Sequence, residues 1–453
     1  MTRSCLTIIL AAGEGTRMKS AIPKVLHKVA GLAMVGHVLE TAREAGGNKR
    51  VVVVGAGAEQ VQTEIASLDP DAVIAVQHER LGTAHAVLAA EEMLKQSFDD
   101  VLVLYGDVPL IQKQSLLDAR QKLQDGADIV VLGFETKDPT GYGRLLVEDG
   151  QLVAIREHKD ASEAERKVTL CNSGIMLFRG DIALATLRAI GNNNSQSEYY
   201  LTDAVEVGRQ NGLNIVVMEV AEEDTLGVNN RVQLAEVEAI WQGRKRIDMM
   251  LGGVTLVAPD SVTFAHDTCI GRDTVIEPDV VFAPGVTIAD NVLIKAFSHL
   301  EGATIAENAI VGPYARLRPG AELLDGSKVG NFCEVKKAVI GEGAKVNHLT
   351  YIGDATIGAK SNIGAGTITC NYDGINKHQT VIGKNVFVGT NSSLVAPVTI
   401  GDEANIAAGS VITRDVPAHA LAIGRGKHVN LDDYARKIRA KNEARKRAAK
   451  NRE

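Results

Sequence analysis

Hydrophobic positions follow two different patterns in the two halves of this 453-residue chain. In the first half, runs of Val, Ile and Leu alternate with amphipathic stretches such as MVGHVLETAREAG and AHAVLAAEEMLKQ. Unbroken aliphatic strands between helices indicate a largely parallel sheet with helices on both faces. The predicted strands are TIIL, RVVVVGA, DAVIAV, DVLVLYGD, IVVLGF and NIVVMEV. The pattern therefore predicts a doubly wound, Rossmann-like α/β domain, in which ligands bind beyond the carboxyl ends of the strands.

In the second half, aliphatic or aromatic residues recur at every sixth position. With 45% of all residues apolar, six successive matches have a chance probability of roughly 1%. A period of six is the signature of a parallel β-helix, in which each repeat is a short strand plus a turn and the aliphatic side chain points into the bore. The three runs are Ile270, Ile276, Phe282, Ile288, Ile294 and Leu300; Val311, Leu317, Leu323, Val329 and Val335; and Ile382, Val388, Leu394, Ile400, Ile406 and Ile412.

Between the halves, NNRVQLAEVEAIWQGRKRIDMMLGG has apolar residues at helical spacing, an Asn at its head and two glycines at its end. We therefore assign 1–228 to the α/β domain, 229–250 to a linker helix and 251–430 to the β-helix. The six-residue register is interrupted once more at TCNYDGINKHQT. An insertion of this kind leaves the stack of a solenoid as a loop, and such loops often carry function.

Residues 431–453 form a basic tail that is predicted to be helical. From Ala435 to Glu453 it has nine Lys or Arg against two Glu, a local charge of +7 in a chain whose net charge is −7. Such a tail could bind RNA or an anionic membrane, but it lacks interleaved aromatics and follows an acidic body. A solvated helix is the favoured interpretation, so we expect neither nucleic acid nor membrane insertion.

The bulk composition favours a cytoplasmic protein. The five cysteines, Cys5, Cys171, Cys269, Cys333 and Cys370, are far apart and form no CxxC pair, so a disulfide framework and a zinc site are both disfavoured. The apolar start runs straight into glycines, unlike a secretory signal, and no apolar run approaches the ~18 residues of a membrane span.

The loop after the first strand, LAAGEGTRMKSAIPK, combines flexible backbone with positive charge. Glycines let backbone N–H groups approach a phosphate, while Arg17 and Lys24 supply fixed cations. A tight turn alone is the competing interpretation. The loop is not a dinucleotide fingerprint, because Met18 replaces the third glycine, and it lacks the GK[ST] of a Walker loop.

This loop resembles the LxxGxGTRM(x)nPK signature of the sugar-phosphate nucleotidyltransferases. The segments QHERLGTAHA, LYGDVPL, DPTGYGR, REHKDA, NSGI, EYYLTD and GVNNR stand in the order found in bacterial N-acetylglucosamine-1-phosphate uridyltransferases. The resemblance implies catalytic roles for Arg17 and Lys24. It also implies that uridine, phosphates and sugar are bound by Leu10, Ala11, Ala12, Gly13, Lys24, Gln77, Gly82, Thr83, Tyr105, Gly106, Asp107, Gly143, Glu157, Asn172 and Asn229. Ala84 stands where the family has glycine.

Nucleotidyl transfer between anionic substrates requires cations, and Mg²⁺ commonly uses one or two protein oxygens plus substrate phosphates. Asp107, at the end of a hydrophobic strand, is well placed to bind the metal, although a turn or helix-capping role is equally compatible with its position. Asn229 by itself is typical of an N-cap. Only the resemblance implies that Asn229 binds Mg²⁺ with Asp107.

The second half departs from a plain repeat in RLRPG, NFCEVKKA, NHLTYIG, SNIGAGTITCNYDG and NKHQT. These stretches resemble the acetyltransferase half of the same family, whose members also acetylate glucosamine-1-phosphate with acetyl-CoA. Acetyl transfer needs a neutral amine, so a base that titrates near neutral pH is expected. His348 is the candidate and Glu334 its possible acidic partner, although a lone histidine is more often structural.

The resemblance assigns the remaining residues of this half. It implies that glucosamine-1-phosphate is bound by Arg318, Lys336, Tyr351, Asn362 and Lys377. It implies acetyl-CoA contacts at Ala365, Asn371, Tyr372, Thr390, Ala408 and Arg425, with Thr390 in place of the usual serine. A left-handed β-helix that assembles as a homotrimer, with this site between subunits, is expected from the family.

Three hypotheses follow. The first is a bifunctional enzyme that acetylates glucosamine-1-phosphate and then transfers UMP from UTP, giving UDP-N-acetylglucosamine for peptidoglycan and lipopolysaccharide. The second is a single-activity nucleotidyltransferase with a structural or regulatory β-helix. The third is a non-enzymatic assembly subunit. Arg17, Lys24 and Asp107 argue against the third, and His348 with the inserted loop argues against the second.

Overall fold

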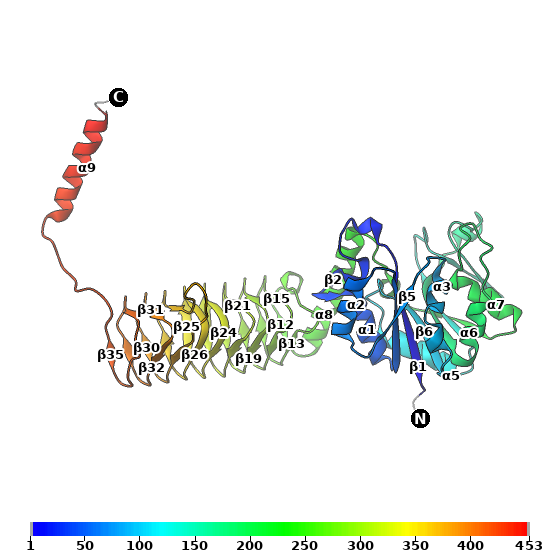
Figure 1. The fold of residues 1–453 in the computed structure, drawn as a ribbon, viewed down its shortest axis with the longest axis horizontal. Coiled ribbons are helices and arrows are strands. Elements are labelled where there is room, and N and C mark those ends of the chain that lie inside the picture. The colour runs from blue at the N-terminus through cyan, green and yellow to red at the C-terminus, as the bar shows by residue number, and fades with distance from the viewer. Residues whose placement is uncertain (1–2, 451–453) are drawn as a thin grey trace. The chain divides into compact units, whose positions relative to one another are not determined.

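The computed structural model describes residues 3–450, and the chain divides into two compact units. The first comprises Met1–Gly252 with the short segments Val262–Thr268 and Phe282–Pro284, and the second holds the remainder. Each is described by itself (Figure 1).

The first unit is built on a mixed sheet with the strand order β11-β7-β10-β6-β1-β4-β5. Strands β4 and β5 follow β1 on one side and β6 lies on the other, so the carboxyl ends of β1 and β6 flank the point where strand order reverses. The strands are β1 (Cys5–Ala11), β4 (Lys49–Gly55), β5 (Val73–Gln77), β6 (Asp100–Tyr105), β7 (Ile129–Glu135), β10 (Leu170–Arg179) and β11 (Ile215–Glu219), with the hairpin β8 (Arg144–Glu148) and β9 (Gln151–Arg156) beside β10, and a separate pair β2 (Lys28–Val29) and β3 (Leu32–Ala33).

Helices cover both faces of this sheet, which gives three layers (Figure 1). On β1, Cys5 and Ile9 face one core while Leu6, Ile8 and Leu10 face the other, as alternation along a strand requires. One core is completed by α1 (Met34–Glu44), α2 (Glu59–Leu68) and α5 (Lys113–Gln124). The other is completed by α3 (Thr83–Leu88), α4 (Glu91–Leu94), α6 (Gly180–Arg188) and α7 (Ala204–Gln210).

The six predicted strands correspond to β1, β4, β5, β6, β7 and β11, but the sequence pattern missed β10. This strand runs antiparallel between β6 and β7. Its apolar part, Ile175 to Phe178, is preceded by the polar segment from Asn172 to Gly174, where the pairing with β7 shifts register. This polar segment reads as a loop in the sequence, although Leu170 to Asn172 pair with β7 and Met176 resumes the pairing.

Helix α8 (Arg231–Leu251) follows the sheet and begins at an Asn, as its sequence predicts. The side chain of Asn230 caps it by accepting hydrogen bonds from Val232 N at 2.9 Å and Gln233 N at 3.0 Å. Val237 of α8 is buried in a small core with Met18 and Met34, at the end of the domain that carries the opening loop.

The second unit is a parallel β-helix. Residues about three hexapeptides apart pair in successive coils, as Ile276 does with Ile294 and Ile294 with Val311. The six-residue positions are buried in the bore, apart from the half-buried Ile270 at its start. One ten-stranded sheet contains β12 (Thr255–Leu256), β14 (Val275–Ile276), β17 (Leu293–Ile294), β20 (Ile310–Val311), β23 (Lys328–Asn331), β25 (Lys345–His348), β27 (Asn362–Ile363), β30 (Phe387–Val388), β33 (Asn405–Ile406) and β35 (Leu421–Ala422), among the described residues.

The other strands pair in a second sheet that forms the remaining faces. They are β13 (Cys269–Ile270), β15 (Val281–Phe282), β16 (Thr287–Ile288), β18 (His299–Leu300), β19 (Ala303–Ile305), β21 (Arg316–Leu317), β22 (Ala321–Leu323), β24 (Glu334–Ile340), β26 (Tyr351–Ile357), β28 (Ile368–Cys370), β29 (Thr380–Ile382), β31 (Ser393–Val395), β32 (Val398–Ile400) and β34 (Val411–Ile412). The predicted loop separates β28 from β29.

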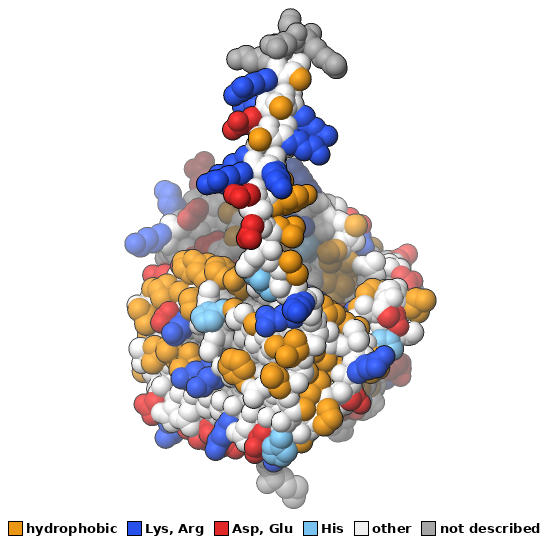
Figure 2. Space-filling model, turned by 90° about the vertical axis from the view of Figure 1, so that its left-hand side faces the viewer, with side chains coloured by type: hydrophobic (Ala, Val, Ile, Leu, Met, Phe, Trp, Pro, Cys, Tyr) orange, Lys and Arg blue, Asp and Glu red, His pale blue; other side chains and the backbone are white. Residues whose placement is uncertain are grey.

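Helix α9 (Tyr434–Lys450) forms most of the basic tail, and Figure 2 shows Lys and Arg side chains along it. Residues 451–453 of the predicted tail lie outside the described residues. Within the part of the chain that the structure describes, no helix has the length and apolar character of a membrane span.

Candidate functional sites

The opening loop follows β1 and folds back on itself at Gly15. This residue has φ 65°, and a Cβ there would lie 2.5 Å from the Cβ of Lys24. Glycine is required for the backbone conformation and for the close approach of Lys24. The loop thus brings Arg17 and Lys24 to the carboxyl ends of β1 and β6.

Lys24 lies between two oxygen-bearing side chains. Its ammonium group pairs with the carboxylate of Asp107, and donates a hydrogen bond to Asn229 Oδ1 at 3.1 Å. Arg17 Nη2 donates to the same oxygen at 3.0 Å. Since Asn230 and not Asn229 caps α8, and Gln112 precedes α5, neither Asn229 nor Asp107 is used as a helix cap here. Two oxygens from distant segments therefore converge on one cation.

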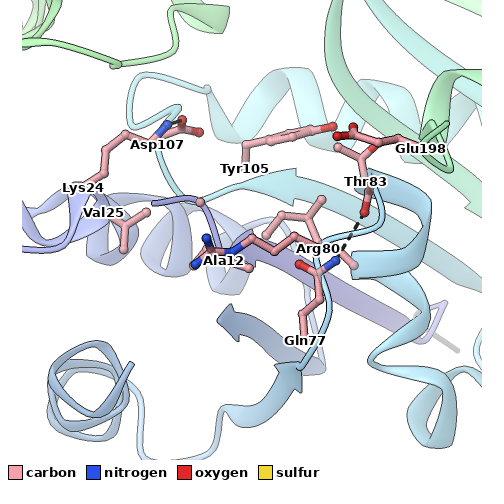
Figure 3. Close-up of a pocket in the computed structure, with 14 residues that line it drawn as sticks. Ala12, Lys24, Val25, Gln77, Arg80, Thr83, Tyr105, Asp107 and Glu198 are labelled. Carbon is pink, nitrogen blue, oxygen red and sulfur yellow. Dashed lines mark hydrogen bonds and ion pairs between the residues drawn. The ribbon is translucent and has the colours of Figure 1, made fainter. Parts of the chain in front are cut away.

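A cavity of about 340 Å³ opens beside this cluster (Figure 3). It is lined by the predicted residues Leu10, Ala11, Ala12, Gly13, Lys24, Gln77, Gly82, Thr83, Tyr105 and Asp107, together with Val25, Arg80, Ala86 and Glu198. At its rim, Gly82 adopts φ 118° and its Cα faces the backbone of Tyr199, so a side chain there would collide. Gly106 donates its N–H to Leu10 O at 2.9 Å and is not among the lining residues.

Arg80 is a cation of this cavity that the sequence did not single out. Its guanidinium pairs with the carboxylate of Glu14, and both side chains are about half exposed. In Figure 3 the Arg80 side chain extends over the strand end near Ala12. The pair therefore joins the loop after β1 to the loop after β5 at the edge of the cavity.

A second cavity, of about 390 Å³, shares Thr83, Tyr105 and Glu198 with the first. Its lining includes the predicted sugar-binding residues Gly143, Glu157 and Asn172. Burial raises the pKa of Glu157, against the opposing effect of Thr202, whose hydroxyl lies 3.5 Å from Glu157 Oε1. Burial likewise raises the pKa of the Tyr105 phenol well above its usual range.

Asp203 lies on the turn next to Thr202. Burial and then the neighbouring Glu206 raise its pKa to about 6. It lines a polar cavity with Asp160, Glu206 and the predicted sugar-binding residue Glu157.

In the β-helix, His348 lies at the end of β25 with an exposed side chain. Its Nδ1 is 2.8 Å from Oδ1 of Asn331, the residue directly beside it in the neighbouring coil. Glu334, the predicted acidic partner, accepts a hydrogen bond from Arg318 Nη1 at 2.7 Å instead. The described contacts of His348 thus place an amide oxygen, rather than the Glu334 carboxylate, on its Nδ1.

Several predicted residues follow one another along successive coils. The backbone joins Gly366 N to His348 O at 3.2 Å, Asn391 N to Ala365 O at 2.7 Å and Gly409 N to Thr390 O at 2.8 Å. Arg425 Nη1 continues the series to Ala408 O at 2.9 Å. His348, Ala365, Thr390, Ala408 and Arg425 therefore form a row along the β-helix.

The remaining predicted residues lie around β26. Tyr351 pairs with Glu334, and Lys336 pairs with Gly353, in the strand register. Asn371 Nδ2 contacts Asp354 and lies 3.5 Å from the Tyr351 hydroxyl. Asn362 begins β27, while Tyr372 and Lys377 lie on the loop between β28 and β29.

Sequence reasoning missed Asn331, Arg80 and Glu198. Asn331 stands in the quoted NFCE segment, and its partner His348 is 17 positions away, which is one coil of the solenoid. Coil spacing is the signal that could have found it. Arg80 and Glu198 carry no comparable signal, because loop conformation alone brings them to the cavity.

The comparisons agree with the fold of both halves of the chain. The family model of the MobA-like NTP transferase domain matches residues 7–169, and that of the bacterial transferase hexapeptide (six repeats) matches residues 267–302 and 379–414. The Bifunctional protein GlmU of Rhizobium rhizogenes is 58% identical over 429 residues, 94% of each chain. Its namesake in Bartonella quintana is 54% identical over 439 residues, 97% of this chain and 98% of that one. The one in Agrobacterium fabrum is 57% identical over 450 residues, 99% of each.

Proposed function

The chain belongs to the GlmU family of bifunctional proteins, and from this premise we propose that it catalyses two successive reactions in two separate units. The β-helix acetylates glucosamine-1-phosphate with acetyl-CoA, and the α/β unit transfers UMP from UTP to the N-acetylglucosamine-1-phosphate formed. The products are UDP-N-acetylglucosamine and pyrophosphate. The observation that carries this proposal is that one chain has both sites. The Lys24, Asp107 and Asn229 cluster lies beside a cavity of the α/β unit, and the row of residues that begins at His348 lies on the β-helix.

In the α/β unit, the first cavity would hold UTP and the second the sugar phosphate. Backbone N–H groups of the glycine-containing loop can approach the phosphates, and Arg17 and Lys24 can stabilise the charge that develops on the transferred phosphoryl group. Gln77 and Gly82 would contact the base, and Gly143, Glu157 and Asn172 the sugar. A raised pKa suits Glu157 to hydrogen bonding with neutral sugar hydroxyls.

Asp107 and Asn229 fit a magnesium ion. One carboxylate and one amide oxygen are ligands that Mg²⁺ accepts, and both already converge on the ammonium of Lys24. Bound Mg²⁺ would neutralise phosphate charge and help orient the triphosphate. The residues of this chain would bind and orient the two substrates.

In the β-helix, His348 would accept a proton from the amine of glucosamine-1-phosphate as that nitrogen attacks the thioester carbonyl. Asn331 Oδ1 accepts the hydrogen of Nδ1 in the tautomer that leaves Nε2 free as the base. Arg318, Lys336, Tyr351, Asn362 and Lys377 would bind the sugar phosphate. Ala365, Asn371, Tyr372, Thr390, Ala408 and Arg425 would bind acetyl-CoA, with Thr390 N–H able to stabilise the oxyanion.

We also propose that the chain forms a homotrimer through the β-helix. Phe297, Tyr314 and Phe332 stack on its surface, with ring centroids 4.8 and 5.2 Å apart, although each side chain is about half exposed. An exposed row of aromatic rings is typical of a protein interface. Sedimentation velocity at assay concentrations should give a trimer, and a fully active monomer would contradict this.

The proposed function is tested by following free thiol and pyrophosphate separately. The protein is mixed with glucosamine-1-phosphate, acetyl-CoA and Mg²⁺, with and without UTP. We expect thiol release without UTP, and pyrophosphate once UTP is added. Pyrophosphate only from ready-made N-acetylglucosamine-1-phosphate, with no thiol, would support a single-activity nucleotidyltransferase. Since UTP and acetyl-CoA are cytoplasmic metabolites, the reaction also supports a cytoplasmic location.

A further inference from the structure

The loop between β28 and β29 is organised by the side chain of Asp373. Its Oδ1 accepts hydrogen bonds from the N–H groups of Ile375 at 2.8 Å and Asn376 at 2.7 Å. Its Oδ2 lies 2.7 Å from Nε2 of His378. The Asn376 amide, then the His378 ring and the Ile375 amide, hold the pKa of Asp373 well below its usual range. Asp373 is therefore an ionised acceptor for three donors of one short loop.

His378 closes the base of the same loop. Its backbone N–H donates to Asn371 O at 2.9 Å, and its ring donates to the Asp373 carboxylate. One residue thus ties the outgoing arm of the loop to the incoming arm at two points. Burial contributes little to the stability of the loop conformation, since the tip residue Ile375 is 87% exposed. Apart from the Tyr372 hydroxyl, which donates to Gly374 O, the described hydrogen bonds within residues 372–378 all involve Asp373 or His378.

These contacts fix where Lys377 lies. Tyr372 and Lys377 form an antiparallel bridge immediately inside the Asn371 and His378 pair. The Lys377 ammonium lies 3.9 Å from the centroid of the Tyr372 ring, so cation–π attraction orients it further. Without the Asp373 carboxylate, the N–H groups of Ile375 and Asn376 lose their acceptor and the four-residue turn between Tyr372 and Lys377 loosens.

We propose that Asp373 and His378 are positioning residues for acetyl transfer, which hold the Lys377 ammonium where it receives the phosphate of the sugar substrate. The inference rests on the proposed function of the β-helix and adds two residues to it. A loop that is already ordered loses less conformational entropy when the substrate binds. Loss of the Asp373 and His378 hydrogen bonds should therefore weaken substrate binding and leave the chemical step unchanged.

The test is the acetyl-transfer kinetics of the full chain with glucosamine-1-phosphate varied. We expect Asp373→Ala to raise KM for the sugar phosphate roughly three- to tenfold, with kcat within about twofold of wild type. His378→Gln keeps a donor for the carboxylate and should approach wild type, whereas His378→Ala should raise KM. Because Asp373 acts through Lys377, the double variant Asp373→Ala, Lys377→Ala should have the KM of Lys377→Ala alone.

Asp402→Ala is the matched control, because this exposed carboxylate also accepts a backbone N–H in the β-helix, from Lys384 at 2.7 Å. It should leave KM unchanged. The inference would be overturned if the increases in KM caused by Asp373→Ala and Lys377→Ala multiplied in the double variant. It would also be overturned if Asp373→Ala had the KM of a wild-type protein that does release thiol. A wild-type protein that releases no thiol would overturn the proposed acetyl transfer itself, and the inference with it.

Discussion

The ammonium group of Lys24 pairs with the carboxylate of Asp107, and Asn229 Oδ1 accepts a hydrogen bond from the same ammonium. The cation and its carboxylate partner are only slightly exposed, with side-chain exposures of 13% for Lys24 and 17% for Asp107. The lysine therefore occupies the position that the proposed site assigns to a divalent cation. On that proposal, Lys24 exchanges this position for the nucleotide phosphates, which frees both oxygens for the metal.

We predict that Lys24→Met binds Mn²⁺, used in place of Mg²⁺, more tightly than the wild type when no nucleotide is present. Removal of a competing charged partner should tighten binding by roughly tenfold. Free Mn²⁺ can be measured by electron paramagnetic resonance during a titration. Pyrophosphate release should fall at least ~100-fold because the phosphates lose a cation, while thiol release should be spared.

The control for this prediction is Asp107→Asn in the Lys24→Met background. The amide lacks the charge that attracts the metal, so the gain in Mn²⁺ affinity should disappear. Equal Mn²⁺ affinity in wild type and Lys24→Met would mean that the lysine does not compete for this position.

Arg80 and Glu14 are predicted to control access of the anionic nucleotide. Arg80→Ala should raise KM for UTP roughly three- to tenfold with little change in kcat, since a cation at the cavity edge is lost. Glu14→Gln should lower KM slightly, because it removes both a repulsive charge and the partner that restrains Arg80. Initial rates of pyrophosphate release at varied UTP check both.

Arg188→Ala is a suitable comparison, because Arg188 also forms an exposed ion pair in this unit, with Glu91. Exposed ion pairs contribute little to stability, so neither variant should affect folding. A KM for UTP that is the same in Arg80→Ala, Arg188→Ala and wild type would show that Arg80 has no role in the site.

The sequence predicted periodic features better than features built from loops. The six-residue positions such as Ile294 and Val388 are buried, because each repeat carries its own signal. Lys24, Asp107 and Gln77 lie at one cavity, since the ends of parallel strands meet at one edge of a sheet. In contrast, β10 was missed, because the polar stretch from Asn172 to Gly174 interrupts it where the pairing with β7 shifts register, and that pairing has no local signal.

The contacts around His348 also could not be predicted from a local sequence pattern. Its pairing with Asn331 depends on the length of one coil, and the coil that carries the inserted loop spans 25 residues where the other paired coils span 16 to 18. A motif identifies residue types but not which side chains face each other across coils. Glu334 was selected by type, whereas the fold pairs it with Arg318.

His348 and Asn331 should therefore differ in kinetic effect. His348→Ala should lower kcat for acetyl transfer by ~10²- to 10⁴-fold, because it removes the proposed base. Asn331→Ala should lower it only about tenfold, because the ring keeps its nitrogen but loses its orienting partner. Both variants should release pyrophosphate normally from N-acetylglucosamine-1-phosphate and UTP.

Asn308→Ala provides a matched control, since this exposed amide contacts Asp325 in another coil and touches none of the proposed site residues. Its thiol release should equal that of the wild type. An Asn331→Ala variant with wild-type thiol release at every pH would remove Asn331 from the proposed mechanism.

The pKa of Asp203 predicts how the stability of the α/β unit depends on pH. Because burial raises this pKa from 3.8 to about 6, the folded state holds a proton that the unfolded state has lost. This contribution to stability is fully present below pH 3.8 and is lost as pH rises through about 6. Asp203→Asn should therefore be more stable than wild type at pH 8, by about 1 to 2 kcal/mol after allowance for partial exposure. Urea unfolding can be followed by the fluorescence of Trp241, the only tryptophan of the chain. The difference in stability between Asp203→Asn and wild type should shrink as the pH falls toward 4. A difference that does not depend on pH would contradict the raised pKa of Asp203.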